Sequence, residues 1–193
     1  MAKRLILVLG GARSGKSRFA EELAGRLGKR VVYLATAEAC DAEMAARIDH
    51  HRQRRPASWR TVEVPLRVGE ALARVAAEAD VALLDCLTLL ASNVMAPLGN
   101  APDPAEAEAR LQGEIDALLA AYQAGRASLI IVSNEVGCGL VPISPLGRVY
   151  RDILGRAHQR LAACADQVLL VVAGIAVDLK RLQVTPDGVA GNA

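Results

Sequence analysis

The chain has 193 residues, of which 52% are hydrophobic and 23% are charged, which is typical of a soluble globular domain. Aromatic residues make up only 3%, and 23 Lys and Arg residues against 21 Asp and Glu residues leave a formal net charge of +2. This composition argues against a nucleic-acid binder, which is normally more basic and richer in stacking aromatics. The apolar runs are too short for a membrane span or a signal peptide. The four cysteines lack CxxC spacing, so we expect reduced cysteines and a cytoplasmic protein.

Short apolar runs alternate along the chain with amphipathic segments. We expect strands at 4–9, 30–35, 59–64, 81–85, 128–133 and 167–174. We expect helices at 17–27, 41–54, 66–79, 86–96, 105–124 and 145–165, and a proline-rich loop at 97–104. This order predicts a single α/β domain over residues 1–180, with a mostly parallel, RecA-like sheet and helices on both faces. Residues 181–193 are expected to form a flexible tail.

A phosphate-binding loop is predicted where the first strand meets the first helix. The segment GGARSGKS fits G-x-x-x-x-G-K-[ST], and the flanking elements argue against a chance match. Gly10 and Gly15 let the backbone turn its N–H groups toward a phosphate, and the helix N-terminus adds a positive dipole end. Lys16 is expected at the β- and γ-phosphates and Ser17 at Mg²⁺. The predicted phosphate-binding residues are Gly10, Gly11, Ala12, Arg13, Ser14, Gly15, Lys16 and Ser17.

Asp85 ends the apolar run VALLD and is the candidate acid for the water shell of Mg²⁺. The alternative is an aspartate that caps the next helix. A phosphate-binding loop with such an acid predicts the use of a Mg²⁺–nucleoside triphosphate without saying what is done with the phosphates. No NKxD guanine-reading motif is present, so a switch GTPase is set aside.

The expected helix at 41–54 carries two adjacent histidines. Helical spacing puts His51 on its apolar side and His50 on its polar side, between Arg47 and Arg54. An imidazole flanked by cations is a candidate nucleophile toward a phosphate ester, because the cations lower its pKa and hold the anion. The alternative is a solvated basic helix with incidental histidines.

Four more positions have open or structural interpretations. Glu63, on the strand at 59–64, either accepts hydrogen bonds from a ribose or assists the metal, or is an exposed strand residue. The segment SNEVGCGLVP follows a strand directly, so it belongs at the same edge of the sheet as the phosphate loop. Within it, Glu135 is either a base or metal-shell residue or part of a turn shaped by glycines. Trp59 is expected to be a packing anchor and His158 a surface or interface residue.

Taken together, these segments resemble the bifunctional cobinamide kinase and cobinamide-phosphate guanylyltransferase family of adenosylcobalamin synthesis. The resemblance extends from about Leu5 to Lys180. Its specific part is the string H-H-R-x-x-R-P-x-x-W-x-T-x-E joined to N-E-V-G-x-G-x-V-P, since the phosphate loop alone occurs in many NTPases. Two departures are conservative: Ser133 stands where the family often has Thr, and Asp85 where some members have Glu.

The resemblance implies two reactions and a homotrimer. ATP or GTP phosphorylates the aminopropanol hydroxyl of adenosylcobinamide. GTP then guanylylates a histidine, here His50, and the GMP passes to adenosylcobinamide phosphate to give adenosylcobinamide-GDP. Besides the phosphate loop, the implied nucleotide contacts are Leu34, Ala35, Thr36, His51, Arg52, Gln53, Arg54, Glu63 and Asp85.

Two competing functions remain. A P-loop small-molecule kinase without a covalent step shares every feature except a functional His50. A RecA-like motor or regulatory ATPase needs a macromolecular partner, which the low aromatic content and near-neutral charge disfavour.

Overall fold

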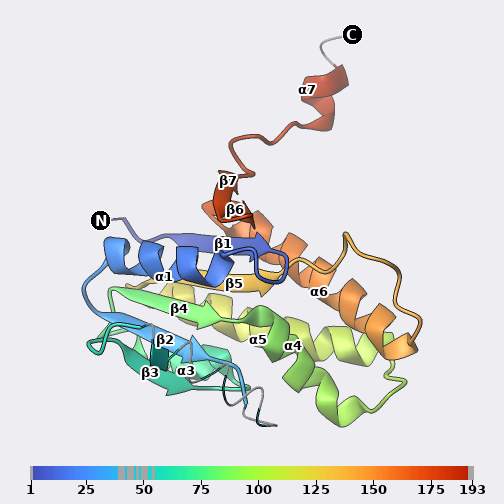
Figure 1. Cartoon of the computed structure of the whole chain (residues 1–193), viewed down its shortest axis with the longest axis horizontal. Helices are drawn as coiled ribbons and strands as arrows, with labels where there is room; N and C mark the ends of the chain where they lie inside the picture. The colour runs from blue at the N-terminus through green and yellow to red at the C-terminus, as the bar shows by residue number, and fades with distance from the viewer. Residues whose placement is uncertain are drawn as a thin grey trace.

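The structure, a computed structural model, describes residues 2–38, 42, 46, 48, 52, 53 and 55–190. The described residues form a seven-stranded sheet in the order β3-β2-β4-β5-β1-β6-β7 (Figure 1). All neighbouring strands are parallel except β6 and β7. The strands are β1 (Leu5–Gly10), β2 (Val31–Ala35), β3 (Arg60–Glu63), β4 (Val81–Asp85), β5 (Ser128–Asn134), β6 (Gln167–Val172) and β7 (Ile175–Asp178). The predicted mostly parallel sheet is therefore confirmed.

Two of the helices begin where the sequence offers a side-chain cap. Asp103 accepts a hydrogen bond from the Ala105 N–H before α5, and Ser144 accepts one from the Gly147 N–H before α6. Each cap is followed by a proline, which is favoured in the first helical turn. The helices are α1 (Lys16–Leu27), α3 (Val68–Val75), α4 (Leu87–Met95), α5 (Pro104–Ala124), α6 (Pro145–Cys164) and α7 (Pro186–Ala190), with a 3₁₀ turn η1 (Ala96–Leu98).

Most of the helix predicted at 41–54 lies outside the described residues. The five of its residues that are described are helical, namely Ala42, Ala46, Ile48, Arg52 and Gln53. Within the described part of the chain, no helix has both the length and the hydropathy to cross a membrane.

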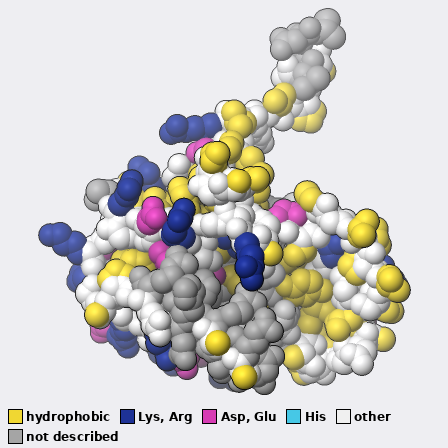
Figure 2. Space-filling view, in the orientation of Figure 1, with side chains coloured by type: hydrophobic (Ala, Val, Ile, Leu, Met, Phe, Trp, Pro, Cys, Tyr) yellow, Lys and Arg dark blue, Asp and Glu magenta, His cyan; other side chains and the backbone are white. Residues whose placement is uncertain are grey.

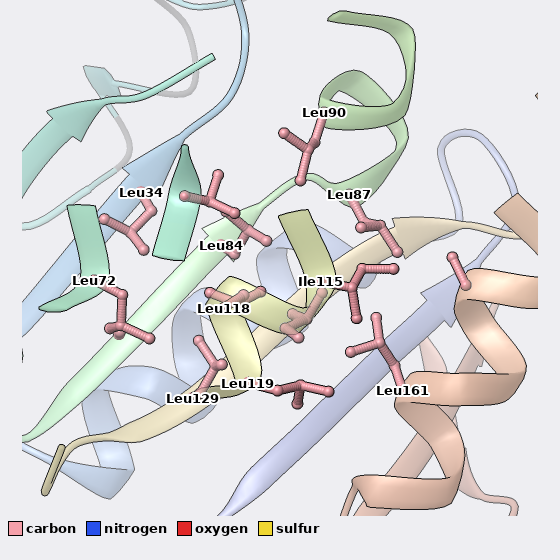
Figure 3. Packing of buried hydrophobic residues seen from close by; sticks show 14 of the residues in the cluster. Leu34, Leu72, Leu84, Leu87, Leu90, Ile115, Leu118, Leu119, Leu129 and Leu161 are labelled. Carbon is pink, nitrogen blue, oxygen red and sulfur yellow. The ribbon is translucent and has the colours of Figure 1, made fainter. Parts of the chain in front are cut away.

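Alternating strand side chains divide the interior into two cores, so helices cover both faces as predicted. On one face, α3, α4, α5 and α6 enclose the larger core. Figure 3 shows strand residues meeting helix residues there: Leu34, Leu84 and Leu129 face Leu72, Leu87, Leu90, Ile115, Leu118, Leu119 and Leu161. On the other face, α1 packs Ala20 and Ala24 against β1, β4 and β5. Trp59 packs against this second core, which agrees with its predicted role as an anchor.

The C-terminal part departs from the prediction of one last strand at 167–174. β6 ends at Val172, and Ala173 and Gly174 form a turn in which both residues have positive φ. The chain then returns as β7, antiparallel to β6 at the edge of the sheet. Beyond it, α7 projects away from the sheet (Figure 1). Exposed apolar side chains lie on β7 and on the chain around it (Figure 2), from the end of β6 to the segment before α7, namely Val172, Ile175, Val177, Leu179, Leu182 and Val184.

Candidate active site

Residues 10–17 form the loop between β1 and α1, at the carboxyl edge of the sheet. Gly15 precedes α1 with φ +93°, a conformation that residues with a Cβ rarely adopt. Gly10 is required for a different reason: a Cβ there would lie 2.5 Å from the carbonyl oxygen of Val171 and 2.6 Å from Ser14 Oγ. The predicted turn role thus holds for Gly15, whereas close packing demands glycine at position 10.

Two backbone hydrogen bonds hold this loop from either side. The Glu135 N–H donates to the Gly10 carbonyl at 3.1 Å, and the Gly174 N–H donates to the Ser14 carbonyl at 2.8 Å. The second bond comes from the turn between β6 and β7. The unpredicted hairpin therefore forms one wall of the loop.

Polar groups inside the loop are arranged for an anion. Lys16, the first residue of α1, is 9% exposed, and its Nζ donates to the Gly11 carbonyl at 3.2 Å. Helix α1 has no side-chain cap, and the first N–H groups of a helix lack intrahelical acceptors. Ser14 Oγ is buried without a hydrogen-bond partner in the described structure. A phosphate group bound at this helix N-terminus would supply acceptors for such donors.

Asp85 lies at the end of β4, and only β5 separates β4 from the phosphate-loop strand β1. Its Oδ2 accepts a hydrogen bond from the Tyr33 hydroxyl at 2.8 Å. The N-cap residue of α4 is Cys86, and that cap makes no side-chain hydrogen bond. The alternative interpretation of Asp85 as a helix cap is therefore wrong, and its carboxylate lies at the edge where ligands of parallel sheets bind.

The partner of Asp85 was missed by the sequence analysis. Tyr33 on β2 is 2% exposed, and the guanidinium carbon of Arg55 lies 3.4 Å from the centre of its ring. Nη1 of Arg55 also donates to Thr61 Oγ1 at 3.3 Å. Burial, reinforced by the charge of Asp85, raises the pKa of Tyr33 well above its usual value, so the hydroxyl remains a donor. The sequence signal that could have identified Tyr33 is its hydroxyl, the one polar side-chain group in the apolar run VVYLA.

The resemblance implies that Leu34, Ala35 and Thr36 contact the nucleotide. These residues lead from β2 to the carboxyl edge of the sheet, where Asp85 lies. The Leu34 side chain is buried in the larger core, so only its backbone is left to contact a ligand. Ala35 lies opposite Asp85 in the β2–β4 register. Thr36 is buried, and its Oγ1 accepts from the Cys86 N–H and donates to the Cys86 carbonyl, both at 2.8 Å.

The remaining predicted contacts are only partly described. Glu63, at the end of β3, is exposed and forms an ion pair with Arg52. Gln53 is also exposed. His50, His51 and Arg54 lie outside the described residues, so their predicted roles stay predictions.

Glu135 stabilises the turn that it begins. Its carboxylate accepts hydrogen bonds from the Gly137 N–H at 2.9 and 2.8 Å and from the Cys138 N–H at 3.2 Å. A carboxylate that accepts three backbone contacts has a local structural role, which favours the turn interpretation over that of a base.

His158 is buried, so its predicted place at the surface or an interface is wrong. It is 8% exposed, and its Nε2 lies 2.7 Å from Ser133 Oγ at the end of β5. It follows Leu154 by four positions and precedes Leu161 by three, so it lies on the buried stripe of α6. Burial lowers the pKa of His158, partly offset by the charge of Glu135.

A second set of hydrogen bonds, partly buried, lies beside this pair. Thr88 Oγ1 accepts from the Asn134 N–H at 2.9 Å, and the Thr88 carbonyl accepts from the Tyr150 hydroxyl at 2.9 Å. Ser133, His158, Thr88, Asn134 and Tyr150 are called the neutral cluster below. They join α4, β5 and α6 next to the phosphate loop.

Comparison with known proteins identifies the family. The family model described as cobinamide kinase / cobinamide phosphate guanyltransferase matches residues 6–179. The chain belongs to this family. It is 48% identical over 181 residues to the bifunctional adenosylcobalamin biosynthesis protein CobU of Salmonella typhimurium, covering 91% of this chain and 99% of that protein. The same figures hold for CobU of Escherichia coli K12. CobP of Pseudomonas aeruginosa is 46% identical over 174 residues, covering 90% and 96%.

As a member of the cobinamide kinase family, the chain has a P-loop NTPase fold, and the predicted resemblance is confirmed. The donor set fits a nucleoside triphosphate with its divalent ion: a buried Ser14 hydroxyl without a partner, the open N-terminus of α1 and the amine of Lys16. Among the described residues, no group of three or more His, Cys, Asp or Glu side chains is placed to hold a metal ion by itself. Ser17 and Asp85 are the residues that would hold such an ion together with phosphate oxygens, which Mg²⁺ commonly takes as ligands.

Proposed function

We propose that this chain phosphorylates the aminopropanol hydroxyl of adenosylcobinamide with ATP or GTP and then transfers GMP from GTP to adenosylcobinamide phosphate. The observation that carries the proposal is a complete phosphate-binding loop in a chain that matches the cobinamide kinase and guanylyltransferase family over residues 6–179. Relatives of nearly the same length, named as bifunctional adenosylcobalamin biosynthesis proteins, support both activities in one chain.

In the kinase step, the substrate hydroxyl oxygen attacks the γ-phosphorus, and the bond to the β–γ bridging oxygen breaks. The hydroxyl proton leaves to solvent, and the products are a nucleoside diphosphate and adenosylcobinamide phosphate. Lys16 and the N-terminus of α1 stabilise the negative charge that develops on the phosphate oxygens. Mg²⁺ held by Ser17 and Asp85 supplies further charge neutralisation when it is bound.

In the transfer step, an imidazole nitrogen of His50 attacks the α-phosphorus of GTP, and pyrophosphate leaves. A phosphate oxygen of adenosylcobinamide phosphate then attacks the same phosphorus, the P–N bond breaks, and His50 is regenerated. Dividing the transfer in this way replaces one difficult step by two easier ones. The position of His50 in the family string and on the polar side of its predicted helix supports this assignment. The remaining nucleotide contacts are proposed to be those that the resemblance implies.

The test is to incubate the protein with Mg²⁺ and GTP labelled at the α-phosphate and then to denature it. We expect a retained label that is acid-labile and alkali-stable, as a phosphoramidate is. His50→Ala should lose the label and keep the kinase step, whereas Lys16→Ala should lose both, because both steps need the triphosphate. Kinase activity in a wild-type protein that retains no label and releases no pyrophosphate would contradict the transfer and leave a plain P-loop kinase.

A homotrimer, which the resemblance implies, is proposed as the assembled state. The exposed apolar side chains between Val172 and Val184 support an association of copies, because such a surface is unfavourable in water. Sedimentation velocity checks this directly, and a monomer at micromolar concentration would contradict it. The cytoplasmic location stays a prediction.

A further inference from the structure

The candidate metal-binding acid is held by a residue that lies outside the phosphate-loop motif. Tyr33 lies opposite Leu83 in the β2–β4 register, and Ala35 lies opposite Asp85. Tyr33 and Asp85 are therefore diagonal neighbours on adjacent strands, a spacing that a phenol ring can bridge. Tyr33 and Leu83 both belong to the core beneath α1, and strand alternation puts Asp85 on that same face.

The two carboxylate oxygens of Asp85 differ in their hydrogen bonding. Oδ2 accepts from the Tyr33 hydroxyl at 2.8 Å, whereas the described residues offer Oδ1 no hydrogen bond. A carboxylate on a freely rotating side chain loses rotamer entropy when it binds an ion. A carboxylate already held by one oxygen loses less, and its other oxygen is presented in a defined direction.

Arg55 stacks on the face of the Tyr33 ring. Its guanidinium carbon is 3.4 Å from the ring centre, a distance at which a cation is attracted to the ring face. Its Nη1 is tied to Thr61 of β3, which fixes the guanidinium relative to the sheet. Arg55, Tyr33 and Asp85 thus form a continuous chain of contacts, called the acid clamp below, from β3 across β2 to β4.

We propose that Tyr33 is a positioning residue, whose hydroxyl sets the orientation of Asp85 so that Oδ1 faces the divalent ion of the bound nucleotide, with Arg55 fixing the ring. The inference rests on the proposed use of a Mg²⁺–nucleotide, and it is independent of His50. The simpler alternative is that a buried phenol needs an acceptor and finds one in Asp85, with no consequence for the ligand.

Tyr33→Phe distinguishes the two, because it removes the hydroxyl and keeps the ring, its packing and the contact with Arg55. The readout is the affinity for a fluorescent GTP analogue, titrated once with Mg²⁺ and once with EDTA. We expect the gain in affinity caused by Mg²⁺ to fall by about tenfold, the scale of one hydrogen bond to a charged group. Affinity in EDTA should be unchanged. An equal loss in Mg²⁺ and in EDTA would overturn the positioning role.

The matched control is Tyr150→Phe. Its hydroxyl is also held by an internal hydrogen bond, to the Thr88 carbonyl, but in the neutral cluster. The same chemical change there should leave the gain from Mg²⁺ as in the wild type. The melting temperatures of both variants show how much stability each loses with its hydrogen bond. A similar loss of stability in both, with a reduced gain from Mg²⁺ in Tyr33→Phe alone, separates the positioning role from general destabilisation.

A double-mutant cycle with Asp85→Asn tests whether Tyr33 acts through the carboxylate. Asp85→Asn should remove most of the gain from Mg²⁺, and adding Tyr33→Phe should then change nothing, because the oriented group is already lost. Arg55→Met should lower the gain by about two- to fivefold, the scale of a cation–π contact, and only while the Tyr33 hydroxyl is present. Additive losses in either cycle would overturn the inference.

The same titrations separate this inference from the proposed function. A wild-type gain from Mg²⁺ that Tyr33→Phe leaves intact overturns the positioning role alone. A wild-type protein whose GTP affinity does not respond to Mg²⁺ overturns both the positioning role and the proposed metal site. The outcome of the His50 labelling experiment affects neither result.

Discussion

The acid clamp and the neutral cluster lie at the same edge of the sheet and differ in chemistry. The clamp, on the face covered by α1, joins a carboxylate, a phenol and a guanidinium. The neutral cluster, on the face covered by α4 and α6, joins hydroxyl, amide and imidazole groups. The charged groups of the clamp lie at the proposed site of the nucleotide and its ion, and each has a partner, because a buried charge without a ligand or partner is costly. In the neutral cluster the Ser133, Thr88 and Tyr150 hydroxyls and the His158 ring make hydrogen bonds, whereas the buried Asn134 Oδ1 has no hydrogen-bond partner in the described structure.

The largest expected effect is at Asp85 in the clamp. Asp85→Asn keeps the size of the side chain and removes its charge, so we expect kinase turnover to fall by about 100-fold, the scale of losing one charged group from a transition-state site. The melting temperature should change little. Steady-state kinetics with adenosylcobinamide measure the loss, and turnover within threefold of the wild type would contradict a metal role for this acid.

Ser133→Ala is the corresponding change in the neutral cluster, and it should act on stability. It leaves the buried His158 ring nitrogen without its partner at 2.7 Å, so we expect a loss of about 1–3 kcal/mol in the free energy of unfolding. Ser133→Thr keeps the hydroxyl and serves as the control. Urea denaturation measures both. An unfolding free energy equal to that of the wild type in Ser133→Ala would show that the pair is not stabilising.

The neutral cluster also predicts a pH dependence of stability, through His158. Burial lowers the pKa of His158 from 6.5, so the folded state holds the neutral ring while the unfolded state takes up a proton more readily. The contribution of His158 is therefore complete above pH 6.5 and is lost as the pH falls through its folded-state pKa. The slope contributed by one such group is at most about 1.4 kcal/mol per pH unit. His158→Gln should reduce the slope of the unfolding free energy against pH below pH 6.5. A slope equal to that of the wild type would contradict this.

The smallest expected effect is at Glu135, which directly follows Asn134 of the neutral cluster. Glu135→Gln keeps an oxygen acceptor for the Gly137 N–H and Cys138 N–H groups, so turnover should change by less than about threefold. A general base replaced in this way typically costs about 10²–10⁴-fold. A loss of that size in kcat would restore the interpretation of Glu135 as a base.

Features carried by neighbouring residues could be predicted from the sequence. The phosphate loop is one contiguous segment in which Gly15, Lys16 and the start of α1 follow each other directly. Apolar runs identified five of the six parallel strands, because strands buried on both faces leave few polar positions, and the alternation of WRTVEV identified the sixth, β3. The family string consists of two segments, at 50–63 and 134–142, each of which is contiguous, and the resemblance drawn from them is confirmed.

Only the tertiary structure could decide which distant residues meet. Tyr33 and Asp85 are 52 positions apart, and their contact depends on β2 and β4 being neighbours in the sheet. Ser133 and His158 are 25 positions apart, and their contact depends on how α6 is rotated over β5. Strand β7 has only four partly exposed residues, which give little local signal, and it pairs along its length with β6. Local propensity and motif spacing determined the elements and the phosphate loop of this protein, whereas strand order and helix rotation, which depend on long-range packing, decided what holds its candidate acid in place.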